Sequence, residues 1–288
     1  MTGGGGQLGR ALGRATWPEG WQPVLRDSRA LDLTDTAALE RQVSESDYAA
    51  VINAGAYTAV DKAESEPVRA WQVNAVGPAA LGAACRAAGI PLVQVSTDYV
   101  FDGSGEEARA PDAPVAPLNV YGASKLGGEL AVRASGAAYA IVRTSWVVSA
   151  DGSNFVKTML RLAGERDALS VVADQIGAPT AADDLAQALV AVARALVDGA
   201  PSGTHHFTNV GATSWHGFAE RIFAESARRG GPSARVSPIA TAAYPTPARR
   251  PANSRLDTTS FEHAFAVTPR PWQAALSDIL DQLIGPAQ

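Results

Sequence analysis

The first half of the chain alternates short apolar strands with longer helical segments, and this alternation constrains the fold more than any other feature. Strands are expected at residues 49–53, 92–96 and 139–144, which read AAVIN, LVQVS and YAIVRT, and helices at 36–46, 66–88 and 120–136. Short strands that are apolar and β-branched along their length are typical of a parallel sheet covered by helices on both faces. We therefore predict an α/β fold with a Rossmann-type doubly wound parallel sheet.

The second half is less regular, although it carries the same kinds of element. Helices are expected at 154–164, 182–198, 214–229 and 272–283, with short strands at 170–173, 205–208 and 235–239. Few apolar runs and many Pro, Arg and Gly residues occupy 230–255. We predict a dinucleotide-binding Rossmann domain over 1–148 and a smaller C-terminal α/β lobe over 149–288. This lobe is expected to close over a cleft, and part of its chain returns to the first domain.

The chain opens on MTGGGGQLGR, in which Gly3, Gly6 and Gly9 have the spacing G-x-x-G-x-x-G, before a short helix expected at 10–16. Glycines at this spacing allow a tight turn and let backbone N–H groups approach a pyrophosphate at a helix N-terminus. A glycine-rich start is also typical of a disordered tail, so the context has to decide.

Polar residues follow the loop at the distance expected for a ribose contact. Asp27, Arg29 and Asp32 lie about 20 residues further on, after a short strand expected at 22–25. Asp27 favours a free 2′-hydroxyl group, whereas Ser28 and Arg29 suit a 2′-phosphate. The sequence therefore leaves NADPH and NADH as alternative cofactors.

The glycine loop lacks the strand that normally precedes it. A Rossmann loop follows a central strand of about five or six residues, but only Met1 and Thr2 precede Gly3. Without this first strand, neighbouring strands leave backbone groups unpaired at about 1–3 kcal/mol each. We expect that the first strand is missing and that the given start lies inside a longer reading frame; the alternative is a truncation that binds cofactor poorly.

The segment YGASK places Tyr121 and Lys125 four residues apart on an expected helix, so both lie on one face. An ammonium group near a phenol favours the phenolate, and such a tyrosine can donate its proton to a carbonyl oxygen as hydride arrives at the carbon. Thr97, at the carboxyl end of the strand LVQVS, lies where open α/β sheets place their ligands. A tyrosine and a lysine at this spacing are usually an ordinary helix surface, but the glycine loop and Thr97 precede them in the expected order.

Composition excludes several classes of function. The net charge is −5, which argues against binding nucleic acid through the whole surface. No apolar stretch reaches the roughly 20 residues that span a bilayer, and no secretory signal is visible. Cys85 is the only cysteine, which fits a reducing cytoplasm. We expect a cytoplasmic protein with no nucleic-acid or membrane partner.

Eight segments occur in an order that resembles one known family. They read GGGGQLG, DLTD, NAGAYTAVDKAE, VSTDYVFDG, YGASK, RTSWV, DQIGAPT and PTPARRPANSRLDT. Together they resemble the dTDP-4-dehydrorhamnose reductase family, within the extended short-chain dehydrogenase/reductases; STDYVFDG and RRPANSRLDT are the most specific. The resemblance implies an oxidoreductase of dTDP-rhamnose biosynthesis that uses NADPH or NADH to reduce the C4 ketone of a dTDP-linked 4-keto-6-deoxysugar, dTDP-4-dehydro-L-rhamnose, giving dTDP-L-rhamnose.

The resemblance also implies that residues 149–288 form mainly a substrate-binding lobe, and it implies roles for individual residues. Tyr121 would donate the proton, Lys125 would lower its pKa and bind the nicotinamide ribose, and Thr97 would hold the sugar carbonyl. The implied cofactor-binding residues are Gly3, Gly6, Gln7, Leu8, Gly9, Asp32, Leu33, Ala54, Ala56 and Tyr57, together with Tyr121 and Lys125. The implied substrate-binding residues are Thr97, Asp98, Tyr99, Trp146, Arg249 and Asn253.

Two of these assignments have competing interpretations. Trp146 is also suited to a core position. Arginine matches the bidentate geometry of phosphate, so Arg249 and Arg250, with Asn253, are candidates for closing over the nucleotide diphosphate. A solvated loop explains these arginines equally well.

We expect no metal site. His205 and His206 occupy adjacent strand positions and so point to opposite faces. Some members of the family form a magnesium-dependent dimer through carboxylates, one of them just after the glycine loop, where this chain reads Arg10-Ala11-Leu12. We therefore expect a monomer or a weak homodimer.

Two further functions remain open. One is the reduction of a different dTDP-4-keto-6-deoxysugar. The other is a non-catalytic, nucleotide-binding regulatory subunit on the same fold. The joint presence of Thr97, Tyr121 and Lys125 argues against the regulatory subunit, which does not need them.

Overall fold

A four-stranded parallel sheet organises the computed structural model, which describes residues 1–287. Its strands are β1 (Val51–Asn53), β2 (Leu92–Thr97), β3 (Tyr139–Thr144) and β8 (Gly203–His206), in the spatial order β1-β2-β3-β8. The connection from β2 to β3 runs through helix α6 (Val120–Ala134). The predicted α/β Rossmann-type fold is confirmed.

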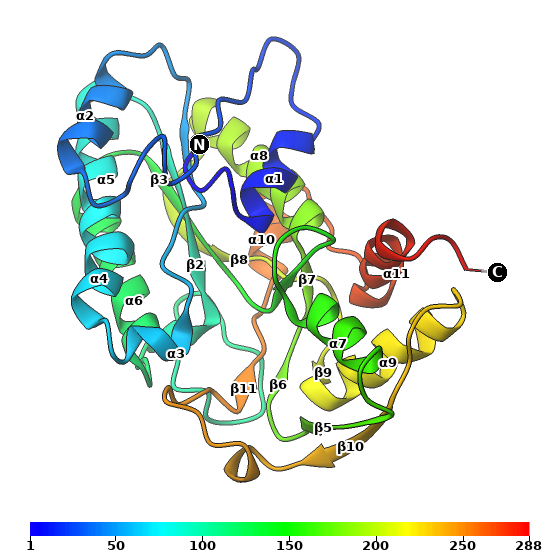
Figure 1. The fold of residues 1–288 in the computed structure, drawn as a ribbon. Coiled ribbons are helices and arrows are strands. Elements are labelled where there is room, and N and C mark those ends of the chain that lie inside the picture. Colours follow the sequence, from blue (N-terminus) through cyan, green and yellow to red (C-terminus); the bar gives the residue numbers. More distant parts are fainter. Residues whose placement is uncertain (288) are drawn as a thin grey trace.

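The helices cover both faces of this sheet, as Figure 1 shows. On one face lie α2 (Thr36–Ser44), α4 (Pro67–Trp71), α5 (Gly77–Ala88) and α6, and on the other lie α1 (Gln7–Arg14) and α8 (Ala182–Val197). Successive residues of β1 serve opposite cores: Val51 packs with the α2–α5 layer and Ile52 with the α1–α8 layer. Burial on both faces explains why these strands are apolar at nearly every position.

The second half forms a smaller α/β region with its own hydrophobic core, built from residues between Val148 and Leu280. Its main elements are α7 (Phe155–Ala163), α9 (Trp215–Ala227), α11 (Trp272–Leu283) and the parallel pair β5 (Ala168–Val172) and β10 (Arg235–Ile239). Short strand pairs connect it to the sheet region: β4 (Val147–Val148) with β7 (Thr180–Ala181), and β6 (Ile176–Gly177) with β9 (Thr213–Ser214) and β11 (Asn253–Ser254). The other short elements are α3 (Val60–Ala63), α10 (Thr259–Phe265), η1 (Gln72–Val76), η2 (Asp98–Val100) and η3 (Thr241–Ala243).

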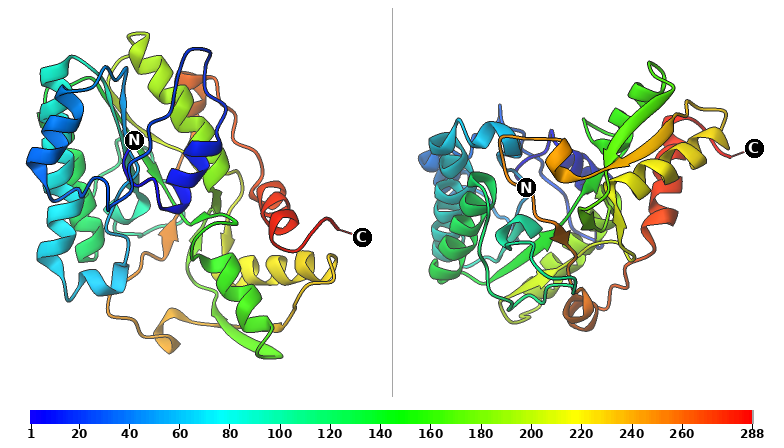
Figure 2. Two further views of the ribbon diagram at one scale, coloured as in Figure 1. Left: turned by 45° about the horizontal axis from the view of Figure 1, so that its top comes forward. Right: turned by 90° about the horizontal axis from the view of Figure 1, so that it is seen from below.

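The segment after β10 crosses back from the smaller region to the sheet region, as both views of Figure 2 show. An ion pair fastens it there: Arg250 Nη2 lies 2.7 Å from Asp61 Oδ2 on α3. Arg249 contributes its backbone carbonyl, which accepts a hydrogen bond from Asn119 Nδ2 at 2.7 Å. The crossing segment is therefore fixed to the sheet region at α3 and at the start of α6.

Local signals explain where several helices begin and end. Asp35 caps α2, since its side chain accepts a hydrogen bond from the Ala38 N–H at 2.9 Å. Gly89 ends α5 in the left-handed conformation, with φ 69°. Both boundaries agree with the predictions, in which one helix begins at residue 36 and another ends at residue 88.

The helix predicted over 66–88 is interrupted, which corrects the prediction. A π-helical segment, η1, separates α4 from α5. Pro78 has no N–H to donate to the carbonyl of Asn74 four residues earlier. A Cβ on Gly128 of α6 would lie only 2.1 Å from that carbonyl oxygen, so α6 also packs closely against it. The irregular turn thus accommodates both the missing donor and the neighbouring helix.

The strand predicted at 22–25 is also absent. This segment and β1 flank the first two residues: Met1 O accepts from the Arg26 N–H at 2.9 Å, and Thr2 N–H donates to Ile52 O at 3.1 Å. A single parallel bridge joins Thr2 to Asn53. A cavity of about 410 Å³ lies beside Met1, between Trp17, Trp21 and the start of β1. With pairing limited to Met1 and Gly4, the segment does not form a ladder.

Among the helices of residues 1–287, none combines the length and the apolar composition needed to cross a lipid bilayer.

Candidate active site

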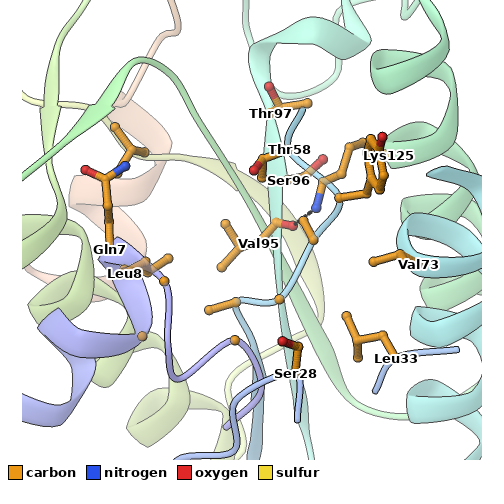
Figure 3. A pocket seen from close by; sticks show the side chains of 18 of the residues that line it. Gln7, Leu8, Ser28, Leu33, Thr58, Val73, Val95, Ser96, Thr97 and Lys125 are labelled. Carbon is orange, nitrogen blue, oxygen red and sulfur yellow. Dashed lines mark hydrogen bonds between the residues drawn. The ribbon is translucent and has the colours of Figure 1, made fainter. Parts of the chain in front are cut away.

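One large cavity of about 920 Å³ lies at the carboxyl ends of β1, β2 and β3, between the glycine loop and α6. Figure 3 shows Gln7 and Leu8 on one wall and Thr97 and Lys125 on the other. The predicted site residues that line this cavity are Gly3, Gly6, Gln7, Leu8, Gly9, Asp32, Leu33, Ala54, Ala56, Tyr57, Thr97, Asp98, Tyr99, Tyr121, Lys125 and Trp146. The fold therefore brings together residues from six separate stretches of the sequence.

The glycine loop packs so closely that side chains are excluded from part of it. A Cβ on Gly9 would lie 2.1 Å from Gly3 O, and one on Gly3 would lie 2.7 Å from the Gly55 backbone nitrogen. Helix α1 begins at Gln7, after Gly6, and no side chain caps its N-terminus. The N–H groups of its first turn have no partner within the helix, and Gln7, Leu8 and Gly9 line the cavity. This end suits an anionic group such as a pyrophosphate.

Lys125 is held in place on the floor of the cavity. Asn119 caps α6 by accepting from the Gly122 N–H at 2.8 Å, which fixes the turn that carries Tyr121 and Lys125. Lys125 Nζ donates to Val95 O at 2.7 Å, a contact drawn in Figure 3. Burial lowers the pKa of Lys125 to about 8, and the negative charge of Glu129 opposes this shift.

Thr97 and Asp98 form the end of β2 and the start of η2. Thr97 Oγ1 donates to Asp98 Oδ1 at 2.9 Å and accepts from the Tyr99 N–H at 3.2 Å. Asp98 is 3% exposed, and its Oδ2 has no hydrogen-bond partner among the described residues. Burial raises the pKa of Asp98 to about 6, while the Ser254 and Thr97 hydroxyl groups hold it lower than burial alone would.

Tyr121 is kept protonated by its surroundings. Burial raises the pKa of Tyr121 above its usual range, and the nearby Asp98 carboxylate raises it further, whereas the Thr97 side chain lowers it. The ring packs edge-on against Tyr99, with centroids 5.4 Å apart. Tyr121 is therefore held as a neutral phenol, and the expected lowering of its pKa by Lys125 is wrong for this structure, because burial dominates.

A buried ion pair supports the end of the sheet next to these residues. Arg143 on β3 and Glu129 on α6 are 1% and 0% exposed, and Arg143 Nη2 lies 2.7 Å from Glu129 Oε2. Ser96 Oγ donates to Glu129 Oε1 at 2.6 Å, and Arg143 Nη1 donates to Pro111 O at 3.0 Å. These bonds join α6, β2 and β3 directly behind Thr97 and Lys125.

Trp146 lies at the mouth of the cavity toward the smaller region. Its ring stacks on Trp215 with centroids 3.5 Å apart and covers Gly177, where a Cβ would lie 2.6 Å from the indole. Its φ is 48°, in the left-handed region that a bulky residue rarely adopts. Close packing around the ring maintains this conformation.

The far end of the cavity is polar and open. Asp27 Oδ1 accepts from the N–H groups of Arg29 and Ala30 at 3.0 and 2.9 Å, so its carboxylate organises its own turn. Arg69 Nη2 lies 3.3 Å from Asp32 Oδ2, and both side chains are about half exposed. Ser28 and Arg29 line the same wall.

Two predicted site residues do not line the cavity. Asn253 is buried on β11, where its amide donates to Glu107 O at 2.8 Å and its Oδ1 accepts from Arg255. Arg249 is exposed on the crossing segment beside the ion-paired Arg250. The structure thus separates these residues from the rest of the predicted set.

The sequence alone did not identify several contributors. Ser96 and Thr58 line the cavity. Glu129 accepts a hydrogen bond from Ser96, and Ser254 lowers the pKa of Asp98. Glu129 lies four residues after Lys125, so the helical spacing could have identified it. Ser254 comes from a distant segment, and no local pattern connects it with Asp98.

Comparison with known proteins gives one consistent result. The family model described as the RmlD substrate binding domain matches residues 1–284. The dTDP-4-dehydrorhamnose reductase of Burkholderia thailandensis is 43% identical over 296 residues, covering 98% of this chain and 99% of the relative. The crystal structure of a dTDP-4-dehydrorhamnose reductase from Clostridium acetobutylicum has a TM-score of 0.91 and 39% identity over 98% of both chains. A Bacillus anthracis dTDP-4-dehydrorhamnose reductase in complex with NADP has a TM-score of 0.89 and 36% identity, over 98% of this chain and 97% of that one.

Proposed function

Because the chain belongs to the RmlD substrate-binding-domain family, we propose that it is an NADPH-dependent reductase of dTDP-4-dehydro-L-rhamnose. It reduces the C4 ketone of this nucleotide sugar and produces dTDP-L-rhamnose, the last step of dTDP-rhamnose biosynthesis. One observation carries the proposal: Thr97, Tyr121 and Lys125 meet at one end of a cavity whose other wall is the glycine loop and the start of α1.

The glycine loop and the start of α1 hold the cofactor pyrophosphate. The fit rests on the close approach of Gly9 to Gly3 and on the uncapped first turn of the helix. Ala54, Ala56 and Tyr57 line the adenine and ribose side, and Lys125 binds the nicotinamide ribose. The reduced nicotinamide supplies the hydride.

Tyr121 donates its proton to the ketone oxygen, which Thr97 also hydrogen-bonds. A phenol in a buried site is a poor acid until negative charge develops on the substrate oxygen. Lys125, fixed by the Val95 carbonyl, stabilises the phenolate that this transfer leaves behind.

The sugar lies between Asp98, Tyr99 and Trp146. Trp146, held in a strained conformation at the mouth of the cavity, provides a flat apolar wall for it. We assign the diphosphate to Arg249, which is exposed, rather than to Arg250, which is paired with Asp61. Asn253 supports the loop that carries these arginines.

The division into residues 1–148 and 149–288 is part of this proposal. The separate hydrophobic core after residue 147 supports it, and α8, β8 and α10 are the segments that return to the sheet region. We also propose a cytoplasmic monomer or weak homodimer that binds neither membrane nor nucleic acid. The single cysteine, Cys85, is buried, as suits a reducing compartment.

The test follows NADPH oxidation with dTDP-4-dehydro-L-rhamnose as substrate. Tyr121→Phe should lower kcat about 10²- to 10⁴-fold, the usual range for loss of a general acid. Tyr244→Phe is the matched control, because that ring is 60% exposed and outside the cavity, and it should turn over as the wild type does. Equal, negligible turnover by the wild type and Tyr121→Phe would reject the proposal.

Turnover measured with a panel of dTDP- and UDP-linked 4-ketosugars distinguishes the proposed substrate from other 4-ketosugars, and an enzyme from a regulatory subunit. A higher kcat/KM with another dTDP-4-keto-6-deoxysugar would reassign the substrate and leave the chemistry unchanged. No turnover, combined with a stoichiometric protein partner, would favour the regulatory subunit.

A further inference from the structure

We infer that Asn154, in the smaller region, is a positioning residue for cofactor binding: it orients the side-chain amide of Gln7 so that the NH₂ group of that amide faces the pyrophosphate. This inference rests on the proposed function and extends it. Gln7 is the first residue of α1, and its side chain lies on the wall of the cavity (Figure 3). A carboxamide accepts hydrogen bonds at one end and donates them at the other. Its orientation therefore decides whether it attracts or repels an anion.

Two backbone groups fix the orientation of the Asn154 amide. Its Oδ1 caps α7 by accepting from the Lys157 N–H at 3.2 Å, and its Nδ2 donates to the carbonyl oxygen of Ser149 at 2.7 Å. A backbone N–H can only donate, and a carbonyl oxygen can only accept. The Asn154 amide therefore has one orientation, with a second N–H group left for a further acceptor.

That second N–H group determines which end of the Gln7 amide is the oxygen. The Gln7 atom 2.9 Å from Asn154 Nδ2 must accept, so it is Oε1, and it is closer than the Asp151 carbonyl oxygen at 3.3 Å. Ser149 Oγ lies 3.0 Å from the same Oε1 and can also donate to it. Gln7 Nε2 is then at the opposite end of the amide. Figure 3 shows it on the side of the cavity, toward Val95.

The segment 149–154 also limits the movement of the Gln7 side chain. Gly152 has a φ of 62°, and a Cβ on it would lie 3.1 Å from Gln7 Cγ. At the other end of α1, Arg14 Nη1 lies 2.7 Å from Asp151 Oδ2. This segment of the smaller region therefore contacts both ends of α1 and packs against the stem of Gln7.

A second glutamine shows the pattern expected of a purely structural amide. Gln187 on α8 binds Thr16 through both of its ends: Oε1 accepts from the Thr16 N–H and Nε2 donates to the Thr16 carbonyl oxygen, each at 3.1 Å. Gln7 differs, because within residues 1–287 only its oxygen is hydrogen-bonded. Its unused donor lies at the uncapped N-terminus of α1, where it adds to the backbone N–H groups that suit a phosphate oxygen.

The test measures NADPH binding by fluorescence titration, without any sugar substrate. Gln7→Ala removes the donor and should weaken NADPH binding about 10-fold, the lower end for a hydrogen bond to a charged group. Asn154→Ser keeps a residue that caps α7 but loses the amide that orients Gln7, and should weaken binding about three- to fivefold. Gln187→Ala is the matched control, because this amide lies outside the cavity lining, and it should bind NADPH as the wild type does.

Two measurements separate positioning from a structural role. In the Gln7→Ala background, Asn154→Ser should change NADPH affinity by less than about twofold, because no amide is left to orient; independent effects would multiply. Adenosine 2′-phosphate carries the adenine end of NADPH without the pyrophosphate, so it should bind the wild type and both single variants equally. Thermal unfolding confirms that the variants are folded.

The results that would overturn the inference are an unchanged NADPH affinity in Gln7→Ala, losses that multiply in the double variant, or an equal weakening of adenosine 2′-phosphate binding. A wild type that binds NADPH but reduces no 4-ketosugar would reject the proposed function and leave the role of Asn154 supported. A wild type that binds adenosine 2′-phosphate but not NADPH would overturn both.

Discussion

The two ends of the cavity differ in how far their charged groups are exposed to solvent. At the end of β2, Thr97, Asp98 and Lys125 are 5%, 3% and 4% exposed, and burial shifts the pKa values of Asp98 and Lys125 toward neutrality. At the far end, the paired Arg69 and Asp32 side chains are 48% and 44% exposed. Desolvation therefore controls protonation at the first end, whereas solvent screens the charges at the second.

The difference follows from the elements that build each end. The buried end is formed by the carboxyl ends of two central strands and by α6, all joined through Glu129 and Arg143. The open end is formed by the Asp27 turn and by α4, at the surface. The groups with shifted pKa values therefore lie at the buried end, and the exposed, paired charges lie at the open end.

Removing the buried ion pair should give the largest effect on stability. Glu129→Ala leaves Arg143 charged and uncompensated in the core, so we expect a loss of about 3–5 kcal/mol in the free energy of unfolding. Chemical denaturation measures this loss. Glu165→Ala is the control: it removes an exposed pair with Arg161 and should cost under about 1 kcal/mol. Equal losses in both variants would show that the buried ion pair contributes no more to stability than the exposed pair.

A methyl group added to the glycine loop should have an intermediate effect, which is measured as a loss of cofactor affinity. In Gly9→Ala the new Cβ would lie 2.1 Å from Gly3 O, so the loop must shift. We expect NADPH to bind about 10- to 100-fold more weakly, which corresponds to an overpacking cost of about 1–3 kcal/mol. Fluorescence titration with NADPH measures this change.

Gly13→Ala is the control on the same helix. Its Cβ would meet only the Leu25 side chain, at 3.3 Å, and alanine is the better helix former. Unchanged NADPH affinity is expected there. A loss as large as that of Gly9→Ala would mean that helix packing, and not the loop, governs binding.

Changing the open end should give the smallest effect. Arg29→Ala should weaken NADPH binding about two- to fivefold and leave NADH binding unchanged, because an exposed contact to a 2′-phosphate contributes about 0.2–1 kcal/mol. The difference should shrink as salt is added. Arg41→Ala, exposed on α2 and outside the cavity, is the control. An equal effect on both cofactors would show that this wall does not recognise the phosphate.

The sequence predicted most of the elements because their signals are local. The Asp35 cap, the stop at Gly89 and the apolar strands depend on hydrogen bonds and side chains within a few residues. The prediction failed over 72–76, where Pro78 and the close approach of Gly128 together produce a π-helical turn. It also failed at 22–25, which has too few backbone partners to form a ladder.

The residues of the candidate site also fall into two groups, those that local sequence patterns identified correctly and those that they did not. The spacing of Tyr121 and Lys125, and the position of Thr97 at a strand end, were visible in the sequence because one helix face and one strand end are local geometry. Arg249 and Asn253 were grouped with the cavity by motif, yet their side chains lie outside its lining. Their positions depend on how the crossing segment docks, which local rules do not describe.

The sequence by itself determined the order of elements, the glycine loop and the identity of the reactive groups, because these depend on short-range sterics and on the chemistry of each side chain. Only the tertiary structure decided that Asp98 is buried beside Thr97 and near Ser254, that Asp61 pairs with Arg250, and that Trp146 is held over Gly177. Desolvation and ion pairing depend on neighbours that are distant along the chain. The pKa shifts of the site therefore depend on tertiary packing, and that of Asp98 also depends on Ser254 from the second half of the chain.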